Sequence, residues 1–468
     1  MQSSAELKQC DNQFIHPWDD IVKLGSNQRT LLDRGEGIYV FDSDGNRLLD
    51  APAGMWCVNI GHGRGEMAQA VYEQIMALPY TSPWSFGTGV AALFAAEIAE
   101  QAPGDLNHVF FTTCGSTAVD SALRFMQFYN NVRGKPEKKH IISQLSGYHG
   151  STYLGGSVSG KERDKSNLDF VEGLVHHIPA PHPLHKPADQ SDADFLDACV
   201  ANLERKIEDV GADKCAIFVA EPILASGGVI VPPTGYHQRC LEVCRKHDML
   251  YLSDEVVTGF GRLGHCFASE AVFGIQPDMI STAKGLTSGY IPMGALLVSD
   301  RLLNEIHEYG GDSAVFSNGY TYSGHPVAAA AGRKNLEIML REKLFEQVRE
   351  NGPYLQQQMQ TLRDIPIVRD VRGMGMMACV ECELKQGGND LAMDYEIGKL
   401  IDKHCQALGL LVRPLINMCV MSPPLTITRD QIDEMVSMLR QGIELAMQEI
   451  ETAEAGSGGQ VNHQPSPV

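Results

Sequence analysis

Short apolar runs alternate along the middle of the chain with segments in which apolar residues recur every three or four positions. Such runs are typical of strands buried on both faces of a parallel sheet, and they occupy residues 109–111, 141–142, 215–220, 249–252 and 295–298. Helical spacing is clearest at Phe195, Leu196, Val200, Leu203 and Ile207. Because a further helical segment, 234–248, connects two of the runs, the pattern predicts βαβ units and a parallel sheet.

The two ends of the chain show shorter strands and longer helices. A hairpin with an Asp-Gly turn is expected within 37–50, followed by a helix over 66–78. After a helix at 328–341, we expect helices at 345–362, 395–408 and 429–449 and strands at 369–372, 377–380 and 410–413. This predicts that residues 1–70 and 331–455 build one small α+β domain, that residues 71–330 form a large α/β domain, and that the Gly/Ser/Pro-rich tail 456–468 is disordered.

Composition and charge narrow the class of protein. The 468 residues are 43% apolar and 21% charged, with a net charge of −20, which argues against nucleic acid or an anionic membrane as a partner. The twelve cysteines form no framework of repeated paired spacings: Cys379 and Cys382 have the only CxxC spacing, and Cys240 and Cys244 are one helical turn apart. With no signal peptide at the start and no apolar stretch long enough for a membrane span, we predict a cytoplasmic protein with reduced thiols.

A lysine and two carboxylates follow the ends of predicted strands. Glu221 and Asp254 end two strands joined by a helical crossover, so both are expected at the same edge of the sheet. Lys284 follows the strand-like residues 280–282, where burial would lower the pKa of its amine and free it for Schiff-base chemistry. A buried aspartate requires a cation, and the protonated ring nitrogen of pyridoxal phosphate is one. Lys284 and Asp254 together therefore predict a pyridoxal-phosphate site.

The segment after the run at 109–111 has the pattern of a phosphate site. Gly115 and Ser116 separate this strand from a helix expected to start near Ala118. Backbone N–H groups and the helix dipole at such a turn attract an anion. The alternative is that Ser116 or Thr117 only caps the helix.

Several motifs in a fixed order resemble the class III, fold-type I pyridoxal-phosphate aminotransferases over about residues 37–439. They are Gly115-Ser116, Tyr148-His149-Gly150, Glu221-Pro222, Asp254-Glu255-Val256, Lys284-Gly285, the segment from Thr321 to Pro326, and Arg413. The resemblance implies a mostly parallel sheet flanked by helices, with Lys284 as the catalytic residue. It also implies the cofactor-binding residues, which are Gly115 and Ser116 at the phosphate, Tyr148 and Val256 on the two faces of the ring, Asp254 at the ring nitrogen, Glu221 paired with an arginine near the ring hydroxyl, and Thr321.

In this family, a threonine at the position of Thr321 reaches the phosphate in the neighbouring subunit, which implies a homodimer with shared sites. A tetramer of two dimers stays open. Trp56 and Arg413 resemble the ω-amine:pyruvate branch, in which these residues and Tyr148 contact the substrate. This implies ping-pong transfer of an amino group from an ω-amine or ω-amino acid to pyruvate, giving L-alanine.

Within the same cofactor class, two alternatives stay open: a 2-oxoglutarate-dependent ω-amino-acid aminotransferase and an aminomutase. Outside it, a catalytically inactive pyridoxal-phosphate-binding protein stays open. The choice of amine is expected to depend on the pocket around Trp56, Trp84, Phe86 and Tyr148.

A rival interpretation is a P-loop nucleotide site, because Gly155 to Lys161 has the Gly-x4-Gly-Lys spacing. Glu162 then replaces the hydroxyl residue that binds Mg²⁺, and no apolar strand directly precedes Gly155. Other motif-like segments are weak. Residues 373–375 lack the third glycine and the helix of a dinucleotide site, and a metal site is not expected at His176, His177, His182 and His185.

Overall fold

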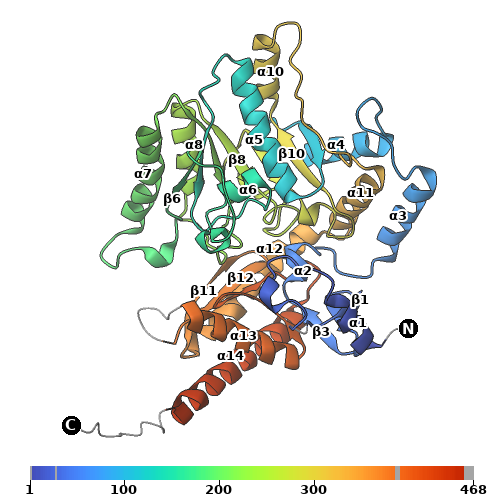
Figure 1. Cartoon of the computed structure of the whole chain (residues 1–468), viewed down its shortest axis with the longest axis vertical. Coiled ribbons are helices and arrows are strands. Elements are labelled where there is room, and N and C mark those ends of the chain that lie inside the picture. The colour runs from blue at the N-terminus through green and yellow to red at the C-terminus, as the bar shows by residue number, and fades with distance from the viewer. Residues whose placement is uncertain (1–2, 27–28, 385–390, 458–468) are drawn as a thin grey trace.

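A seven-stranded sheet forms the centre of the larger half of the molecule, at the top in Figure 1. Strand β10 runs antiparallel to both of its neighbours, β4 and β9, whereas the other neighbours pair in parallel. The predicted mostly parallel α/β sheet is therefore confirmed. In spatial order, the strands are β4 (His108–Thr112), β10 (Gly294–Val298), β9 (Met279–Thr282), β8 (Leu250–Asp254), β7 (Cys215–Ala220), β5 (His140–Gln144) and β6 (Val175–Ile178).

Helices cover both faces of this sheet, which explains why its central strands are continuously apolar. Along β7, Ile217 and Val219 belong to the apolar cluster that contains residues of α5 and α10, whereas Phe218 and Ala220 belong to the cluster with α7 and α8. Successive side chains of a strand point to opposite faces, so every residue of β7 is buried.

Five helices of the larger half agree with predicted segments: α3 (Gly65–Ala77), α5 (Gly115–Val132), α7 (Asp192–Val210), α8 (Tyr236–Lys246) and α11 (Pro326–Arg341). Four others were not predicted, namely α4 (Gly89–Gln101), α6 (Tyr153–Val158), α9 (Ala268–Ala271) and α10 (Asp300–Tyr309). Helix α5 begins three residues before the predicted start near Ala118. The reason is a local cap, in which the Thr117 hydroxyl accepts a hydrogen bond from the Cys114 N–H at 3.0 Å.

Two four-stranded sheets form the smaller half, at the bottom in Figure 1. The two chain ends meet in one of them, because β13 pairs in parallel with β3 through Leu410 and Leu49. The first sheet contains β1 (Leu32–Glu36), β2 (Tyr39–Asp42), β3 (Arg47–Asp50) and β13 (Leu410–Leu411), and the second contains β11 (Val368–Met374), β12 (Met377–Cys382), β15 (Met418–Met421) and β14 (Arg413–Leu415). The other helices of the two chain ends are α1 (Ser4–Asp11), α2 (Ala53–Trp56), α12 (Leu344–Gln360), α13 (Leu391–Ala407) and α14 (Arg429–Ser457).

This computed structural model describes residues 3–26, 29–384 and 391–457. The predicted disordered tail, 456–468, lies almost entirely outside the described residues. Within them, no helix is long and apolar enough to cross a membrane. The domain limits at residues 70, 330 and 455 stay predictions, and helix α11 runs across the second of them.

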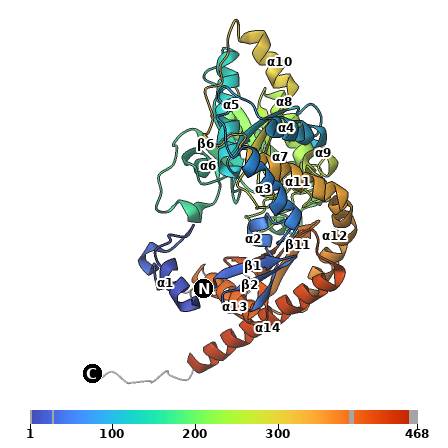
Figure 2. The same ribbon diagram turned by 90° about the vertical axis from the view of Figure 1, so that its right-hand side faces the viewer.

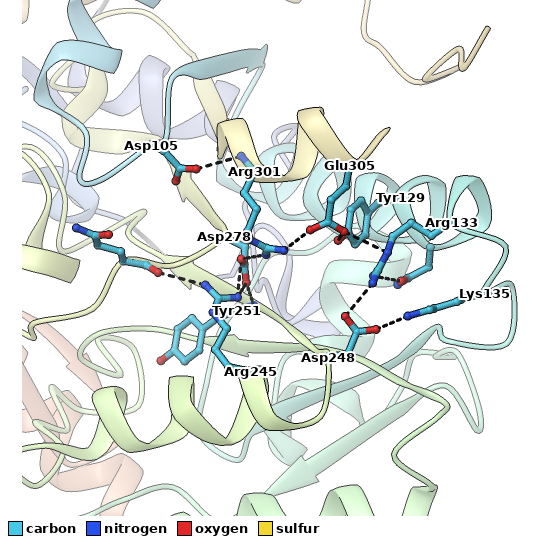
Figure 3. Close-up of polar contacts among 12 residues, drawn as sticks. Asp105, Tyr129, Arg133, Lys135, Arg245, Asp248, Tyr251, Asp278, Arg301 and Glu305 are labelled. Carbon is cyan, nitrogen blue, oxygen red and sulfur yellow. Dashed lines mark hydrogen bonds and ion pairs between the residues drawn. The ribbon is translucent and has the colours of Figure 1, made fainter. Parts of the chain in front are cut away.

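Strands β8 and β9 are held together at their amino ends by a buried carboxylate (Figure 3). Asp278 accepts hydrogen bonds from Arg245 at 2.6 and 2.7 Å and from the Tyr251 N–H at 2.7 Å, and it also contacts Arg301. Figure 3 shows that Arg301 continues this network towards Glu305. The two Arg245 contacts both come from Nη1, and Asp278 therefore joins Arg245, Arg301 and the start of β8 at one carboxylate. These contacts define the relative positions of the two strands where they start. Their other ends carry the site residues.

Candidate active site

A cavity of about 340 Å³ opens at the carboxyl ends of the central strands. Its size is in the range of small-molecule sites, and open α/β sheets bind ligands at this edge. The prediction that Glu221 and Asp254 share one sheet edge is confirmed, because both line this cavity together with Lys284. Of the other predicted site residues, the cavity brings together Trp56, Gly115, Ser116, Tyr148 and Val256.

Lys284 directly follows β9 and Ala283, at the start of a short 3₁₀ turn, Lys284–Leu286. Its backbone φ is +45°, which is uncommon for a residue with a side chain and is often found at functional sites. Burial lowers the pKa of the Lys284 amine, while the nearby charges of Asp254 and Glu221 oppose that shift. An amine with a lowered pKa is more often neutral, and a neutral amine is the nucleophilic form.

The Asp254 carboxylate is buried and fully supported by hydrogen bonds. One oxygen accepts from the Ser281 hydroxyl at 3.0 Å and the Val256 N–H at 3.2 Å, and the other lies 2.7 Å from His149 Nδ1. Burial alone would lower the pKa of His149, but the hydrogen bond and charge of Asp254 raise it above its usual value. Sequence reasoning had not assigned a role to His149. The only signal was its place beside Tyr148 in a motif of the family.

Glu221 does not pair with an arginine among the described residues, so that part of the prediction is wrong. Its two oxygens instead accept hydrogen bonds from the backbone N–H groups of Tyr148 and Ala225, each at 2.9 Å. The physical reason is that the loop after β5 folds over the end of β7 and supplies a backbone donor. Burial raises the pKa of this carboxyl, and the charge of His149 partly offsets the shift.

The amino end of helix α5 forms one wall of the cavity. Gly115 lies against Val256, and a Cβ atom at Gly115 would come within 2.9 Å of that side chain. Ser116 lies against Gly150, where a Cβ atom would be 2.7 Å from the Ser116 Cα. Small residues therefore let two loops approach the helix start, where free N–H groups and the dipole favour an anion.

Trp56 lines both this cavity and a second one, the outer chamber. The outer chamber has a volume of about 570 Å³, and Trp56, Tyr148 and Lys284 line both spaces. The Trp56 indole is buried, and its ring centroid lies 5.5 Å from both Lys284 Nζ and Arg413 Cζ. Arg413 belongs to β14 of the smaller half, so the substrate space lies between the two halves of the molecule.

Three residues expected near the substrate or cofactor lie outside both cavities within this chain. Thr321 is exposed and its carbonyl accepts a hydrogen bond from the Tyr80 hydroxyl at 2.9 Å. Trp84 and Phe86 are 93% and 68% exposed. The prediction that these two aromatic residues shape the pocket is wrong for the single chain, because residues 80–86 lie on the surface instead.

The rival P-loop interpretation is contradicted by the local structure. A P-loop connects a strand to a following helix, whereas helix α6 (Tyr153–Val158) overlaps the start of the motif and Lys161 lies beyond its end. The four histidines of the possible metal segment form no such cluster, since no group of three or more metal-binding side chains occurs in the described part of the chain.

The residues that line the inner cavity fit pyridoxal phosphate. Backbone donors at the start of α5 suit a phosphate, the buried Asp254 carboxylate suits a protonated ring nitrogen, and the Lys284 amine suits an aldehyde. Tyr148 and Val256 would lie along the ring. When bound, this group supplies an electron-withdrawing ring that makes a substrate C–H bond acidic.

The fold and this residue set define a pyridoxal-phosphate-dependent enzyme of fold type I. Residues 23–443 match the family Aminotransferase class-III. The putrescine–pyruvate aminotransferase of Pseudomonas aeruginosa is 41% identical over 92% of this chain and 94% of its own length. The mitochondrial gamma-aminobutyrate transaminase 1 of Oryza sativa subsp. indica is 36% identical over 87% and 80%.

Among solved structures, an (S)-enantioselective omega-transaminase from Thermomicrobium roseum superposes with a TM-score of 0.91 at 35% identity, covering 96% of this chain and 99% of that one. The chain therefore belongs to the class III aminotransferases. It is a pyridoxal-phosphate-dependent enzyme that transfers an amino group from an amine to a keto acid.

Proposed function

We propose that this aminotransferase moves the amino group of a primary ω-amine or ω-amino acid to pyruvate in two half-reactions at one site. The products are an aldehyde or ketone and L-alanine. The observation that carries this proposal is the position of Arg413, whose guanidinium lies against the same indole as the Lys284 amine. A cytoplasmic location stays a prediction.

Arg413 suits a carboxylate that is present in only one half-reaction. Its guanidinium has no hydrogen-bond or ion-pair partner within residues 3–26, 29–384 and 391–457, and burial lowers its pKa. A guanidinium without a partner can form a bidentate pair with the pyruvate carboxylate. When the substrate is a carboxylate-free amine, the same side chain can stay in the outer chamber, which it already lines.

The visible absorption of the purified protein tests the proposed reaction. We expect a yellow band that disappears when L-alanine is added and returns when pyruvate is added after the alanine has been removed. Loss of the band with alanine requires amino transfer to the bound cofactor, and its return requires pyruvate as acceptor. A yellow protein that responds to glutamate and 2-oxoglutarate but not to this pair would show the alternative acceptor instead.

The variant Arg413→Ala serves as the control for the acceptor. The band should still disappear with a carboxylate-free amine, because that step uses Lys284. Its return with pyruvate should need about 100-fold more pyruvate, since a charge-assisted bidentate pair contributes about 1.5–3 kcal/mol. Equal pyruvate dependence in both proteins would remove Arg413 from this role.

We also propose that two copies of the chain form a dimer with shared sites. Tyr80 and Tyr322 are exposed and pack against each other beside Thr321, and Trp84 and Phe86 are exposed in the segment that follows Tyr80. Exposed aromatic side chains of this kind favour burial against a partner, which would place Thr321 at the neighbouring cavity. Sedimentation velocity should show twice the mass of one chain. The double variant Trp84→Ser, Phe86→Ser should sediment as a monomer, and a monomeric parent protein would contradict the proposal.

A further inference from the structure

The outer chamber contains more positive than negative side chains. Its charged lining residues are Arg29, Lys161, Arg163, Asp164, Lys284 and Arg413. Three of these have partners in ion pairs, since Arg29 pairs with Asp19 at 2.9 Å and Arg163 with Asp164 at 3.2 Å. Lys161 and Arg413 are cations without any hydrogen-bonded or ion-paired carboxylate in the part of the chain that the structure describes.

Lys161 is the last residue of the segment with P-loop spacing, Gly155 to Lys161. It lies three residues after helix α6 ends at Val158, and its ammonium group faces the Tyr148 ring at 5.4 Å from the centroid. Tyr148 lines both cavities and Lys161 lines the outer one, so Lys161 lies beside a residue that the two spaces share. The lysine therefore has a place in the substrate space.

The electrostatics of Lys161 favour an anion beside it. Burial lowers its pKa to about 8, and the charges of Arg163 and Arg413 contribute to the shift, while Asp164 and Glu221 oppose it. The charge of Arg163 also lowers the pKa of Arg413. Cations that repel one another in a partly dry chamber are stabilised by an anion that contacts more than one of them.

We propose that Lys161, together with Arg413, binds a carboxylate of the substrate that is remote from the reacting carbon. This rests on the proposed function and names its substrate class. Such a carboxylate is present on an ω-amino-acid donor and on a dicarboxylic keto-acid acceptor. A diamine would instead bring a second ammonium into a chamber whose unpaired groups are cations. In this respect the chain differs from what the name of the Pseudomonas aeruginosa relative says of that protein.

Three donors of the same length, with pyruvate as acceptor, test the end-group preference. These are 4-aminobutyrate, butylamine and putrescine, whose far ends are negative, neutral and positive. We expect kcat/KM to fall in that order, with about a tenfold preference for 4-aminobutyrate over butylamine, as for one charge-assisted hydrogen bond. In Lys161→Met this ratio should fall to about one through a change in KM. Putrescine as the best donor of the parent protein would overturn the proposal.

Two further variants separate a local effect of charge from a change in folding. Lys161→Arg should keep most of the preference because it retains the charge. Lys165→Met is the matched control, since Lys165 is half-buried four residues further on, contacts the Ser157 carbonyl at 3.4 Å and lies outside both cavities. A ratio that changes as much in Lys165→Met as in Lys161→Met would refute a specific role for Lys161.

Replacing pyruvate by 2-oxoglutarate at a fixed donor shows whether the remote carboxylate belongs to the acceptor. The site binds the acceptor if Lys161→Met leaves the preference for 4-aminobutyrate over butylamine unchanged but lowers turnover with 2-oxoglutarate about tenfold. The proposal would be overturned if Lys161→Met changed neither the donor preference nor the turnover with 2-oxoglutarate.

Calorimetric titration with glutarate gives a readout that does not need turnover. Glutarate should bind the parent protein about tenfold more tightly than butyrate does, and Lys161→Met should bind both equally. A protein that binds glutarate in this way but transfers no amino group would contradict the proposed function and leave the anion site intact. Equal binding of glutarate by the parent protein and Lys161→Met would contradict the anion site and leave the proposed function intact.

Discussion

Lys284→Ala is expected to lower kcat by at least about 10⁴-fold, because we assign two tasks to its amine. It would hold the cofactor between turnovers, and once released it would move the proton to and from the substrate carbon. Among the lining residues of the inner cavity, Lys284 supplies the one amine, so no neighbouring side chain of that cavity can replace it. Single-turnover assays with a primary amine donor measure the loss.

The control for this variant is chemical rescue. Substitution by alanine removes the buried lysine side chain without filling its space, so a small amine such as methylamine can enter and restore part of the rate. The thermal unfolding temperature should change little, because burial disfavours the charged form of the amine that is removed. A Lys284→Ala protein within tenfold of the parent activity would remove this residue from the reaction.

The pattern of apolar residues was sufficient to predict the strands that carry Glu221 and Asp254. The run 215–220, the helix after it and the run 249–252 predicted one βαβ unit, and the position of Glu221 and Asp254 at one sheet edge followed from strand direction alone. The strand β7 was predictable because it is buried on both faces, and such a strand consists of a continuous run of apolar residues. The start of α5 was misplaced since a cap depends on the hydrogen bonds of Thr117.

Contacts between distant loops were not predictable from pattern. His149 and Asp254 are 105 residues apart, and their 2.7 Å contact depends on how the loop after β5 folds. For the same reason Glu221 proved to be held by backbone N–H groups instead of an arginine. Lys161 was noticed only for a spacing that belongs to another fold. Its position beside Tyr148 follows from the end of helix α6, which carries no distinct signal in the sequence.

Asp254→Asn is expected to lower kcat by about 10³-fold, with little change in the fold. The amide has the shape of the carboxylate, so Ser281 can still donate to its oxygen, and His149 can accept from its NH₂ group after a change of tautomer. What disappears is the negative charge that would stabilise a protonated ring nitrogen. Stopped-flow measurement of each half-reaction should show both slowed, because both require the same electron-withdrawing ring.

Ser281→Ala is the matched control, since it removes one 3.0 Å hydrogen bond from the same carboxylate and leaves its charge. A neutral hydrogen-bond donor to a charged group is worth about 1.5–3 kcal/mol at most, and the remaining contacts with His149 and the Val256 N–H should hold Asp254 in place. We therefore expect kcat to fall by at most about 10- to 150-fold in this variant, less than in Asp254→Asn. If Asp254→Asn and Ser281→Ala lost activity equally, the role of Asp254 would be to position the loop and not to supply charge.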